Sequence, residues 1–389
     1  MRILHLATYL QGGAGRVIVD LAIDQHRGGH EVAIVTSRTA VPGYGHYGAY
    51  IEELTAAGVE LRLVDSLFTR DHAANVAVVQ ALTEHYAPGQ EPAIVHAHAA
   101  IPSLIGLLFA GARARPIPVV QTMHGWGVTK TPGQAAADVS LMNLVSGVVV
   151  PSQHSAGLMA SLGVLPDRLV TIPYGVGRDR VAPEPRDKEV LHAMSRAREG
   201  GAMAVVCVGT VGPRKNQTLL VEALRRIGSA ASIALWIIGD GDTGGLQAAI
   251  SAMGLDRRIR LHGYSRAARS LAAGADVLVL PSRSEGQPIS ILEAYADGTL
   301  VVVSDIPELA ELVEDGDIGT TFHSDDATSL AGALVGLAKM PESEREARRA
   351  RARQVQESRY TTSTMAQQYL DFYYRRLAVM SRSRVSSAA

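Results

Sequence analysis

The chain has 389 residues, a formal net charge of -1 and a single cysteine, Cys207. This length predicts two or three domains, and the balanced charge excludes the basic field typical of proteins that bind nucleic acid. One cysteine excludes an intrachain disulfide and favours a reducing, cytoplasmic location. The longest apolar stretch, residues 99–112, is too short to span a bilayer, so we expect a buried helix there and no stable membrane insertion.

The first predicted unit is a strand over residues 2–7, followed by a glycine-rich turn at residues 11–16 and a helix. Glycines let the backbone approach an anion, and a helix N-terminus offers free N–H groups, so Gly12 and Gly13 are candidate phosphate contacts. Ile18 stands where a dinucleotide-binding motif would place its third glycine, which argues against NAD. A tight turn without a ligand is the alternative.

Strands and helices alternate through the rest of the first half, which predicts a parallel sheet covered by helices. His98 follows one strand, and His124 and Trp126 follow the next, at the sheet edge where such folds bind ligands. A lone histidine is usually structural, which is the alternative for His98. The further strands are expected over residues 31–35, 59–64, 93–97, 118–122 and 147–150.

A proline-broken connector at residues 181–185 separates this series from a second one. The second series starts with a strand over residues 204–208 and a turn that carries Arg214 and Lys215. Two cations at a strand end suit a diphosphate, and a merely solvated turn is the alternative. We therefore predict three parts: residues 1–177, residues 178–360, and a last helix with a frayed tail over residues 361–389.

Two glutamates, Glu285 and Glu293, stand eight positions apart after the buried strand predicted at residues 277–280. Glu285 lies in the loop after the strand, and Glu293 lies in the helix that follows. A carboxylate at this edge needs hydrogen-bond donors, which sugar hydroxyls supply. A helix cap and a solvated charge are the alternatives. The inward face of the helix is expected to carry Ile289, Leu292 and Ala296.

The order of these patterns resembles the GT-B glycosyltransferases, in particular the large retaining family 4 of nucleotide-sugar-dependent enzymes. The patterns are the early glycine turn, the connector, Gly-x5-Lys from Gly209 to Lys215, and Glu-x7-Glu from Glu285 to Glu293. The resemblance spans nearly the whole chain. It implies two Rossmann-like α/β domains facing each other across a cleft, with a C-terminal helix that crosses back to the first domain. The second domain would bind the nucleotide sugar, and the first would bind the acceptor.

The resemblance also implies roles for individual residues. Glu293 would accept hydrogen bonds from ribose, Glu285 would bind the transferred sugar, and His124 would lie beside the anomeric carbon. The implied catalytic residues are His124, Glu285, Arg214 and Lys215. The implied donor-binding residues are Gly12, Gly13, Thr210, Arg214, Lys215, Tyr264, Glu285, Gly286, Gln287, Pro288, Ile289 and Glu293. The implied acceptor-binding residues are Tyr9, Gln11, His98, Trp126 and Lys130, and we expect neither a metal nor a cofactor beyond the nucleotide-sugar co-substrate.

Three positions depart from the family pattern. Thr210 replaces the arginine that commonly follows the glycine of the second phosphate loop. Tyr174 replaces the usual asparagine before the connector, and the usual double glycine is absent ahead of Pro307 and Glu308. Recognition of the donor is therefore expected to differ in detail from that of the family.

The expected reaction moves a hexosyl group of glucosyl or N-acetylglucosaminyl type, from an NDP-sugar and most simply a UDP-sugar, to a hydroxyl of a small glycoside or cyclitol. An antibiotic intermediate resembling an aminoglycoside is one such acceptor, and a cell-surface polysaccharide or glycolipid is the alternative. Paired carboxylates also serve hydrolases, and an epimerase, a phosphorylase or a non-catalytic nucleotide-sugar-binding protein remain rivals. The donor sugar, acceptor and oligomeric state are left open.

Overall fold

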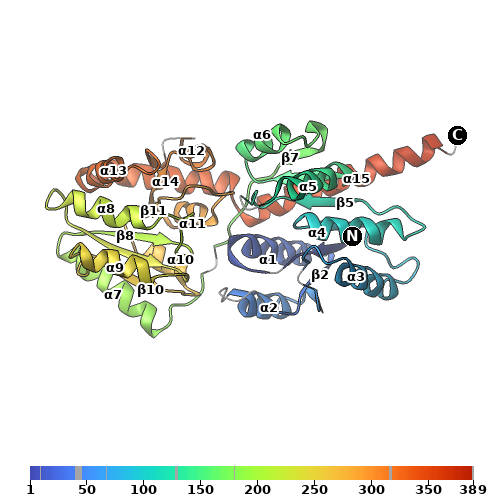
Figure 1. Cartoon of the computed structure of the whole chain (residues 1–389), viewed down its shortest axis with the longest axis horizontal. Helices are drawn as coiled ribbons and strands as arrows, with labels where there is room; N and C mark the ends of the chain where they lie inside the picture. The colour runs from blue at the N-terminus through green and yellow to red at the C-terminus, as the bar shows by residue number, and fades with distance from the viewer. Residues whose placement is uncertain are drawn as a thin grey trace. The chain divides into compact units, whose positions relative to one another are not determined.

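The computed structural model describes residues 1–8, 10–39, 46–66, 68–127, 130–178, 180–314 and 318–387. The chain divides into two compact units. Unit 1 comprises Met1–Gly175 with Thr362–Ala389, and unit 2 comprises Val176–Thr361. Each unit is a Rossmann-like α/β domain built on one parallel sheet (Figure 1). The two-domain α/β architecture expected from the sequence is therefore confirmed.

Unit 1 contains, within its described residues, a seven-stranded sheet of order β3-β2-β1-β4-β5-β6-β7 in which the paired strands run parallel. The strands are β1 (Arg2–Leu6), β2 (Glu31–Ser37), β3 (Glu60–Val64), β4 (Ile94–Ala97), β5 (Val119–Thr122), β6 (Gly147–Val150) and β7 (Leu169–Thr171). The helices are α1 (Gly12–Arg27), α2 (His46–Ala56), α3 (His72–His85), α4 (Ala100–Gly111), α5 (Pro132–Leu144), α6 (Gln153–Ser161), the short η1 (Pro166–Arg168) and α15 (Thr362–Ser387).

Unit 2 contains, in the part that is described, a six-stranded parallel sheet of order β10-β9-β8-β11-β12-β13. The strands are β8 (Met203–Val208), β9 (Ile233–Ile238), β10 (Ile259–Gly263), β11 (Val277–Leu280), β12 (Leu300–Ser304) and β13 (Thr320–Phe322). The helices are α7 (Pro185–Glu199), α8 (Thr218–Ile227), α9 (Gly244–Ala252), α10 (Ala268–Ala273), α11 (Ile289–Asp297), α12 (Pro307–Glu314), α13 (Ala327–Lys339) and α14 (Glu342–Arg359).

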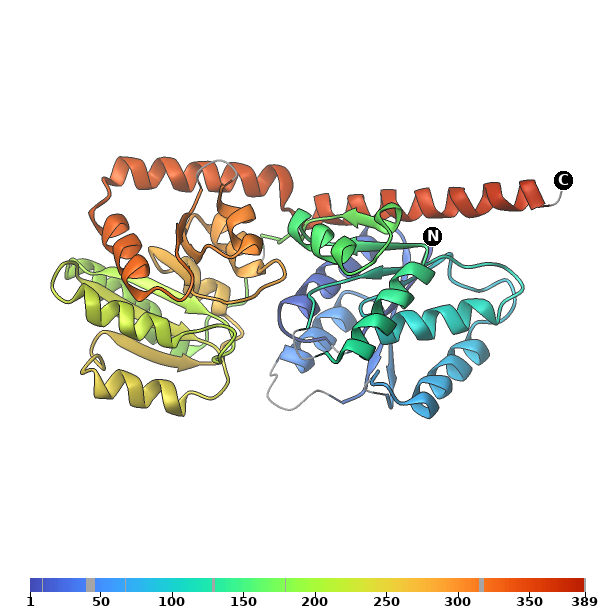
Figure 2. The same cartoon turned by 45° about the horizontal axis from the view of Figure 1, so that its top comes forward.

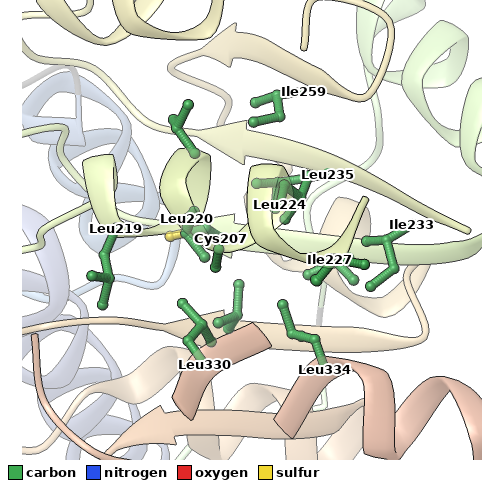
Figure 3. Close-up of a cluster of buried hydrophobic side chains, with 14 of the residues drawn as sticks. Cys207, Leu219, Leu220, Leu224, Ile227, Ile233, Leu235, Ile259, Leu330 and Leu334 are labelled. Atoms are coloured by element: carbon green, nitrogen blue, oxygen red, sulfur yellow. The ribbon is translucent and has the colours of Figure 1, made fainter. Parts of the chain in front are cut away.

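The core of unit 2 follows from continuous apolar runs in its central strands. All residues of β11 are buried, as expected for a strand covered on both faces. Figure 3 shows Leu220 and Leu224 of α8 gathered with Leu330 and Leu334 of α13 over the sheet. This packing fixes the strand ends from which the loops that carry Arg214, Lys215 and Glu285 leave.

The last helix, α15, belongs to unit 1 and packs against α1. Figure 2 shows α15 at the end of the chain, in red. Its side chains Tyr369, Phe372 and Tyr373 are fully buried. The expected return of the C-terminal helix to the first domain is therefore confirmed. Among the described residues, no helix is both long enough and apolar enough to cross a membrane.

Several elements were not expected from the sequence, among them β7, β13 and α7. Strands β7 and β13 have three residues each and are only partly buried, so neither produces a strong pattern. Helix α7 begins inside the proline-rich connector, with Pro185 in its first turn. Glu184 and Asp187 form a capping box at this helix start, in which each side chain accepts a hydrogen bond from the backbone N–H of the other. The pair of acidic residues three positions apart was a sequence signal for the start of a helix.

The expected inward face of α11 is partly wrong. The buried residues are Ile291, Leu292, Ala294 and Tyr295, whereas Ile289 and Ala296 are only partly buried. The helix also packs against α14, which shifts the buried arc relative to a simple one-sided pattern. Glu293 therefore shares the more open face with Ile289 and Ala296.

Candidate functional site

In unit 1 the glycine turn joins the end of β1 to the start of α1. Gly12 has a φ of 55°, which favours glycine, and α1 begins there. A Cβ on Gly15 would lie 2.8 Å from the backbone carbon of Leu10, so a larger residue would push the turn away from the helix. The turn thus presents the first N–H groups of α1 at the carboxyl edge of the sheet.

This turn forms one side of a cavity of ≈ 340 Å³ within unit 1. The structure brings Gln11, Gly13, His98 and His124 together in its wall, as the sequence predicted for ligand-facing residues. The oxygen Oε1 of Gln11 is buried and has no hydrogen-bond partner within the described structure. The described residues that line the cavity are Thr8, Gln11, Gly13, Ala14, Ile18, His98 and His124. None of these is a lysine or an arginine, so the wall carries no positive charge while the two histidines are neutral.

Behind the cavity, the histidines form a continuous chain of hydrogen bonds. His124 Nε2 lies 3.0 Å from His98 Nδ1, and His98 Nε2 lies 3.0 Å from His5 Nδ1. His5 Nε2 lies 2.9 Å from Oε1 of Gln25. At the other end, the Tyr174 hydroxyl lies 2.8 Å from His124 Nδ1. His98 and His124 therefore belong to a network that reaches the centre of the sheet.

Burial keeps these imidazoles neutral. It lowers the pKa of His5 and of His124 to about 4. It also lowers the pKa of His96 and of His98 well below the ordinary value, with a further contribution from the neighbouring histidines. Each ring therefore carries one N–H donor and one acceptor nitrogen near neutral pH.

Three of the histidines, His5, His96 and His98, have nitrogens within 4.8 Å of one another, a spacing that a metal ion could use. Each of their ring nitrogens already has a protein partner: His96 bonds Tyr373 and Thr122, and the other two bond within the chain described above. The cluster therefore fits a hydrogen-bond network rather than a metal centre.

Two predicted acceptor residues, Trp126 and Lys130, are not among the described residues that line this cavity. The Lys130 ammonium stands 3.6 Å from the ring centre of Trp126 and 3.0 Å from Oδ2 of the buried Asp138. Arg70 donates to the other oxygen of the same carboxylate. Trp126 and Lys130 thus form a separate, charge-compensated cluster, and Tyr9 lies outside the described residues.

In unit 2 the loops after β8 and β9 are held together by their backbones. Gly209 N donates to Ile238 O at 2.9 Å, and Val211 N donates to Asp240 O at 2.6 Å. A Cβ on Gly239, whose φ is 154°, would lie 2.1 Å from the Gly209 oxygen. Glycine is therefore required at residue 239 for the two loops to meet.

Glu285 is the centre of an ion-paired triad at this edge. Its carboxylate lies 2.6 Å from Lys215 Nζ and 3.0 Å from an Arg214 nitrogen. The Glu285 side chain is 6% exposed and that of Lys215 is 14% exposed, whereas Arg214 is 53% exposed. Burial alone would raise the pKa of Glu285, but Lys215 and Arg214 hold it below its ordinary value. Three of the four predicted catalytic residues thus meet, with Arg214 toward solvent.

The triad is supported by a second set of polar contacts. Arg283 donates to the oxygen of Pro213 at 3.0 Å and to Asp325 at 2.8 Å. Asp325 also accepts from the Asn216 amide at 2.9 Å. Asn216 and Asp325 both have positive φ, 55° and 59°, a conformation that these polar residues tolerate better than most. Arg283 and Asp325 therefore link the loop that carries Arg214 to the loop that carries Glu285.

The other predicted donor residues lie on loops at the same sheet edge or on α11. The Thr210 hydroxyl donates to Asp240 at 3.2 Å, and the backbone oxygen of Tyr264 accepts from Arg186. The segment between Glu285 and Glu293 contains the predicted contacts Gly286, Gln287, Pro288 and Ile289, of which Gln287 and Pro288 are buried.

Sequence reasoning missed the residues that act behind these groups. His5 stands in the buried strand β1 and Gln25 stands on the buried face of α1, and a fully buried polar side chain at such a place is a signal for a buried network. Arg283 and Asp325 carry no such signal, because charged residues in loops are common and their meeting depends on the fold. Tyr174 was noted only as a departure from the family.

Comparisons with known proteins identify the family of this chain. Residues 11–180 match the family described as Glycosyltransferase Family 4, and residues 202–340 match the one described as Glycosyl transferases group 1. The galactosyltransferase of Escherichia coli named for UDP-Gal and alpha-D-GlcNAc-diphosphoundecaprenol is 28% identical over 62% of this chain and 65% of its own length. D-inositol 3-phosphate glycosyltransferase 1 of Catenulispora acidiphila is 25% identical over 80% of this chain and 87% of its own.

N-acetyl-alpha-D-glucosaminyl L-malate synthase of Bacillus anthracis is 24% identical over 93% of this chain and 94% of its own. Among solved structures, Anabaena HepE with UDP and glucose superposes with a TM-score of 0.79 at 19% identity, covering 96% of this chain and 100% of that one. The two family regions together cover most of the sequence. The protein therefore belongs to the family 4, or group 1, glycosyltransferases and has the GT-B fold.

Proposed function

We propose that this glycosyltransferase moves a hexosyl group of glucosyl or N-acetylglucosaminyl type from a UDP-sugar to a hydroxyl of a small polar acceptor, with retention of the anomeric configuration. The triad of Glu285, Arg214 and Lys215 carries this proposal. It places two cations and one carboxylate together at the carboxyl edge of a parallel sheet, where such folds bind ligands. A nucleoside diphosphate linked to a sugar offers the phosphate charge and the hydroxyls that these groups require.

In this proposal Arg214 and Lys215 of unit 2 bind the diphosphate. Glu285 accepts from hydroxyls of the transferred sugar, and Glu293 accepts from the ribose. The base lies near Gly263 and Tyr264. Anabaena HepE forms complexes with UDP, with UDP and glucose, and with UDP-glucose, which supports UDP as the carrier.

The bond between the anomeric carbon and the leaving phosphate oxygen breaks, and a bond from the acceptor oxygen forms on the same face. The acceptor proton passes to the departing phosphate oxygen. Negative charge develops on that phosphate, so Arg214, Lys215 and oriented N–H groups contribute most to stabilising the transition state. Glu285 acts by position, and it is not used as a hydrolase nucleophile.

His124 is not used as a general base in this scheme. Both of its ring nitrogens are hydrogen-bonded within unit 1, and burial lowers its pKa to about 4. It would therefore contact the sugar as a neutral, fixed ring beside the anomeric carbon. This supports transfer of the proton to the phosphate rather than to the protein.

The acceptor is proposed to be a neutral or cationic small glycoside or cyclitol, a class that includes aminoglycoside-like antibiotic intermediates. The described residues that line the cavity of unit 1 are neutral, and Lys130 is compensated by Asp138. A phosphorylated acceptor would need uncompensated cations. Glycosylation of a cyclitol is also consistent with the name of the Catenulispora relatives, although those names specify a phosphate.

A second candidate is the synthesis of a cell-surface polysaccharide or glycolipid. It is favoured by the name of the Escherichia coli relative, which specifies a lipid diphosphate acceptor. The neutral cavity of unit 1 argues against a diphosphate at that place.

The test is a product assay by mass spectrometry. Purified enzyme is incubated with UDP-, GDP- and dTDP-sugars, each with cyclitols, aminocyclitols, small glycosides and a polyprenyl-diphosphate acceptor. The proposal predicts a hexosylated small acceptor with a UDP-sugar, and NMR of the product should show the donor's anomeric configuration. Donor binding without any product would favour a non-catalytic protein, and efficient transfer to the lipid diphosphate alone would favour the second candidate.

A further inference from the structure

The hydrogen-bond chain behind the cavity has a direction, and this direction follows from one amide. Gln25 places its oxygen Oε1 toward His5 Nε2 and its nitrogen Nε2 toward the Tyr373 hydroxyl, 3.4 Å away. An amide oxygen only accepts, so His5 must carry its proton on Nε2 and accept at Nδ1.

The same logic passes along the chain. His98 must donate from Nε2 to His5 Nδ1 and therefore accept at Nδ1. His124 must then donate from Nε2 to His98 Nδ1 and accept at its own Nδ1, where the Tyr174 hydroxyl donates. Every neutral ring is thus used once as donor and once as acceptor, and all three carry the proton on Nε2.

A branch continues this pattern into α15. The Tyr373 hydroxyl accepts a hydrogen bond from the Gln25 amide nitrogen and donates one to His96 Nδ1 at 2.7 Å. His96 then donates from Nε2 to Thr122 at 2.7 Å, and Thr122 lies 2.9 Å from the Tyr369 hydroxyl. The C-terminal helix thereby contributes two hydroxyls to the network that ends at the cavity.

The ring geometry is that of a hydrogen-bonded row. The planes of His5 and His98 differ by 16°, and those of His98 and His124 differ by 22°, with ring centres 5.3 Å apart in both pairs. Gln25, His5 and Tyr373 are fully buried, and Tyr174 is 3% exposed. Water is therefore a poor substitute for a missing partner, and loss of one link leaves a buried polar group unpaired.

From these contacts we propose that Gln25, His5, His98 and Tyr174 are positioning residues that fix His124 in one neutral tautomer and one ring orientation at the cavity wall. The expected effect on turnover rests on the proposed function, whereas the tautomer does not depend on it. Tyr174 stands where the family commonly has asparagine, so the contact from residue 174 to His124 departs from the family pattern. His124 can turn toward a ligand only by giving up a partner.

The first test reads the tautomers directly. Protein labelled with ¹⁵N-histidine is examined by NMR near neutral pH, and the rings are assigned with His5→Gln, His98→Gln and His124→Gln. The proposal predicts that His5, His98 and His124 are neutral and carry the proton on Nε2. Protons on Nδ1, which the reversed chain would require, or a charged ring would overturn it.

The second test uses variants that change one link. Tyr174→Phe and Gln25→Leu remove a donor and an acceptor, whereas Gln25→Glu keeps the acceptor toward His5. In the first two, the His124 signals should split or shift toward the other tautomer, and kcat should fall on the order of tenfold or more with little change in the KM for the donor. Gln25→Glu should restore the Nε2 proton on His5.

The matched control is Tyr86→Phe, which alters a buried tyrosine of unit 1 that takes no part in the hydrogen bonds between the histidines described above. It should leave both the His124 signals and kcat unchanged. Unchanged His124 signals in Tyr174→Phe and Gln25→Leu would overturn the positioning role, as would an unchanged kcat in an active enzyme. If the wild-type protein transfers no sugar, the proposed function fails. The NMR signals then still show whether His5, His98 and His124 have the proposed tautomers.

Discussion

The two units share a Rossmann-like architecture, but the corresponding sheet edge is neutral in unit 1 and charged in unit 2. In both, a glycine turn follows the first strand and polar side chains gather beyond the strand ends. Unit 1 places neutral imidazoles there, each hydrogen-bonded to the next. Unit 2 places Glu285 between Lys215 and Arg214 as an ion-paired triad.

This difference shows that the fold supplies the place and the side chains supply the chemistry. A neutral network is specified by hydrogen-bond direction and fails when a ring gains a proton. An ion-paired triad is specified by charge, and it remains intact until its carboxylate is protonated. The two edges should therefore respond differently to acid, to substitution and to ligand.

The largest effect is expected from acid. The ordinary histidine pKa is 6.5, and burial lowers it to about 4 for His5 and His124. The unfolded chain therefore binds more protons below pH 6.5, and the free energy of unfolding of unit 1 should fall between pH 6.5 and 4. Each of these two rings should remove roughly 3 kcal/mol by pH 4.

The free energy of unfolding of unit 2 should change little between pH 6.5 and 4.5. The pKa of Glu285 is held below its ordinary 4.5, so its stabilising contribution is lost only as the pH falls below that value. Trp126 lies in unit 1 and Trp236 in unit 2, so the single-tryptophan variants Trp126→Phe and Trp236→Phe report each unit by fluorescence. Parallel loss of urea resistance by both units from pH 6.5 to 4.5 would contradict this account.

Breaking the triad should have the next largest effect. Glu285→Gln removes the charge that holds Lys215 and Arg214 and weakens acceptance from sugar hydroxyls. We expect kcat/KM to fall roughly 10²- to 10³-fold, since aligned charge is the main catalytic contribution proposed here. Glu189→Gln on the exposed surface of α7 is the matched control. If Glu285→Gln and Glu189→Gln had equal kcat/KM, Glu285 would have no role in the reaction.

The glycine turns should also differ between the units. A Cβ on Gly239 would collide with Gly209 O, whereas the space around a Cβ on Gly12 is open within 4 Å. Gly239→Ala should destabilise unit 2 by about 2–3 kcal/mol, and Gly12→Ala should cost unit 1 only about 1 kcal/mol through its positive φ. Urea unfolding read through Trp236 and Trp126 measures both, and the reverse order would refute the packing argument.

The smallest effect is expected at the cluster of Lys130, Trp126 and Asp138. Lys130→Met removes a partly exposed ion pair and a cation–π contact, which should cost about 1 kcal/mol. Because this cluster lies outside the described cavity wall, the KM for the acceptor should change less than in Gln11→Ala. A larger rise in KM for Lys130→Met would return Lys130 to the acceptor site.

Much of the fold could be predicted from the sequence because buried parallel strands are continuous apolar runs, as at residues 277–280. The loop residues at strand ends, His98, His124, Lys215 and Glu285, could also be found from position. Their partners could not, because the pairing of His5 with His98 or of Arg283 with Asp325 depends on which strands and loops become neighbours. The open face of α11 was misjudged because its second contact, α14, lies about fifty residues further along the chain.

The central claim is that the charged edge of unit 2, and not the neutral edge of unit 1, binds the nucleoside diphosphate. Titration calorimetry with UDP on Glu293→Gln, Lys215→Met and Tyr174→Phe tests it most directly. The account predicts a loss of roughly 1.5–3 kcal/mol of binding free energy for each of the first two variants and no change for the third. Unchanged UDP affinity in Glu293→Gln and Lys215→Met, or an equal loss in Tyr174→Phe, would contradict it.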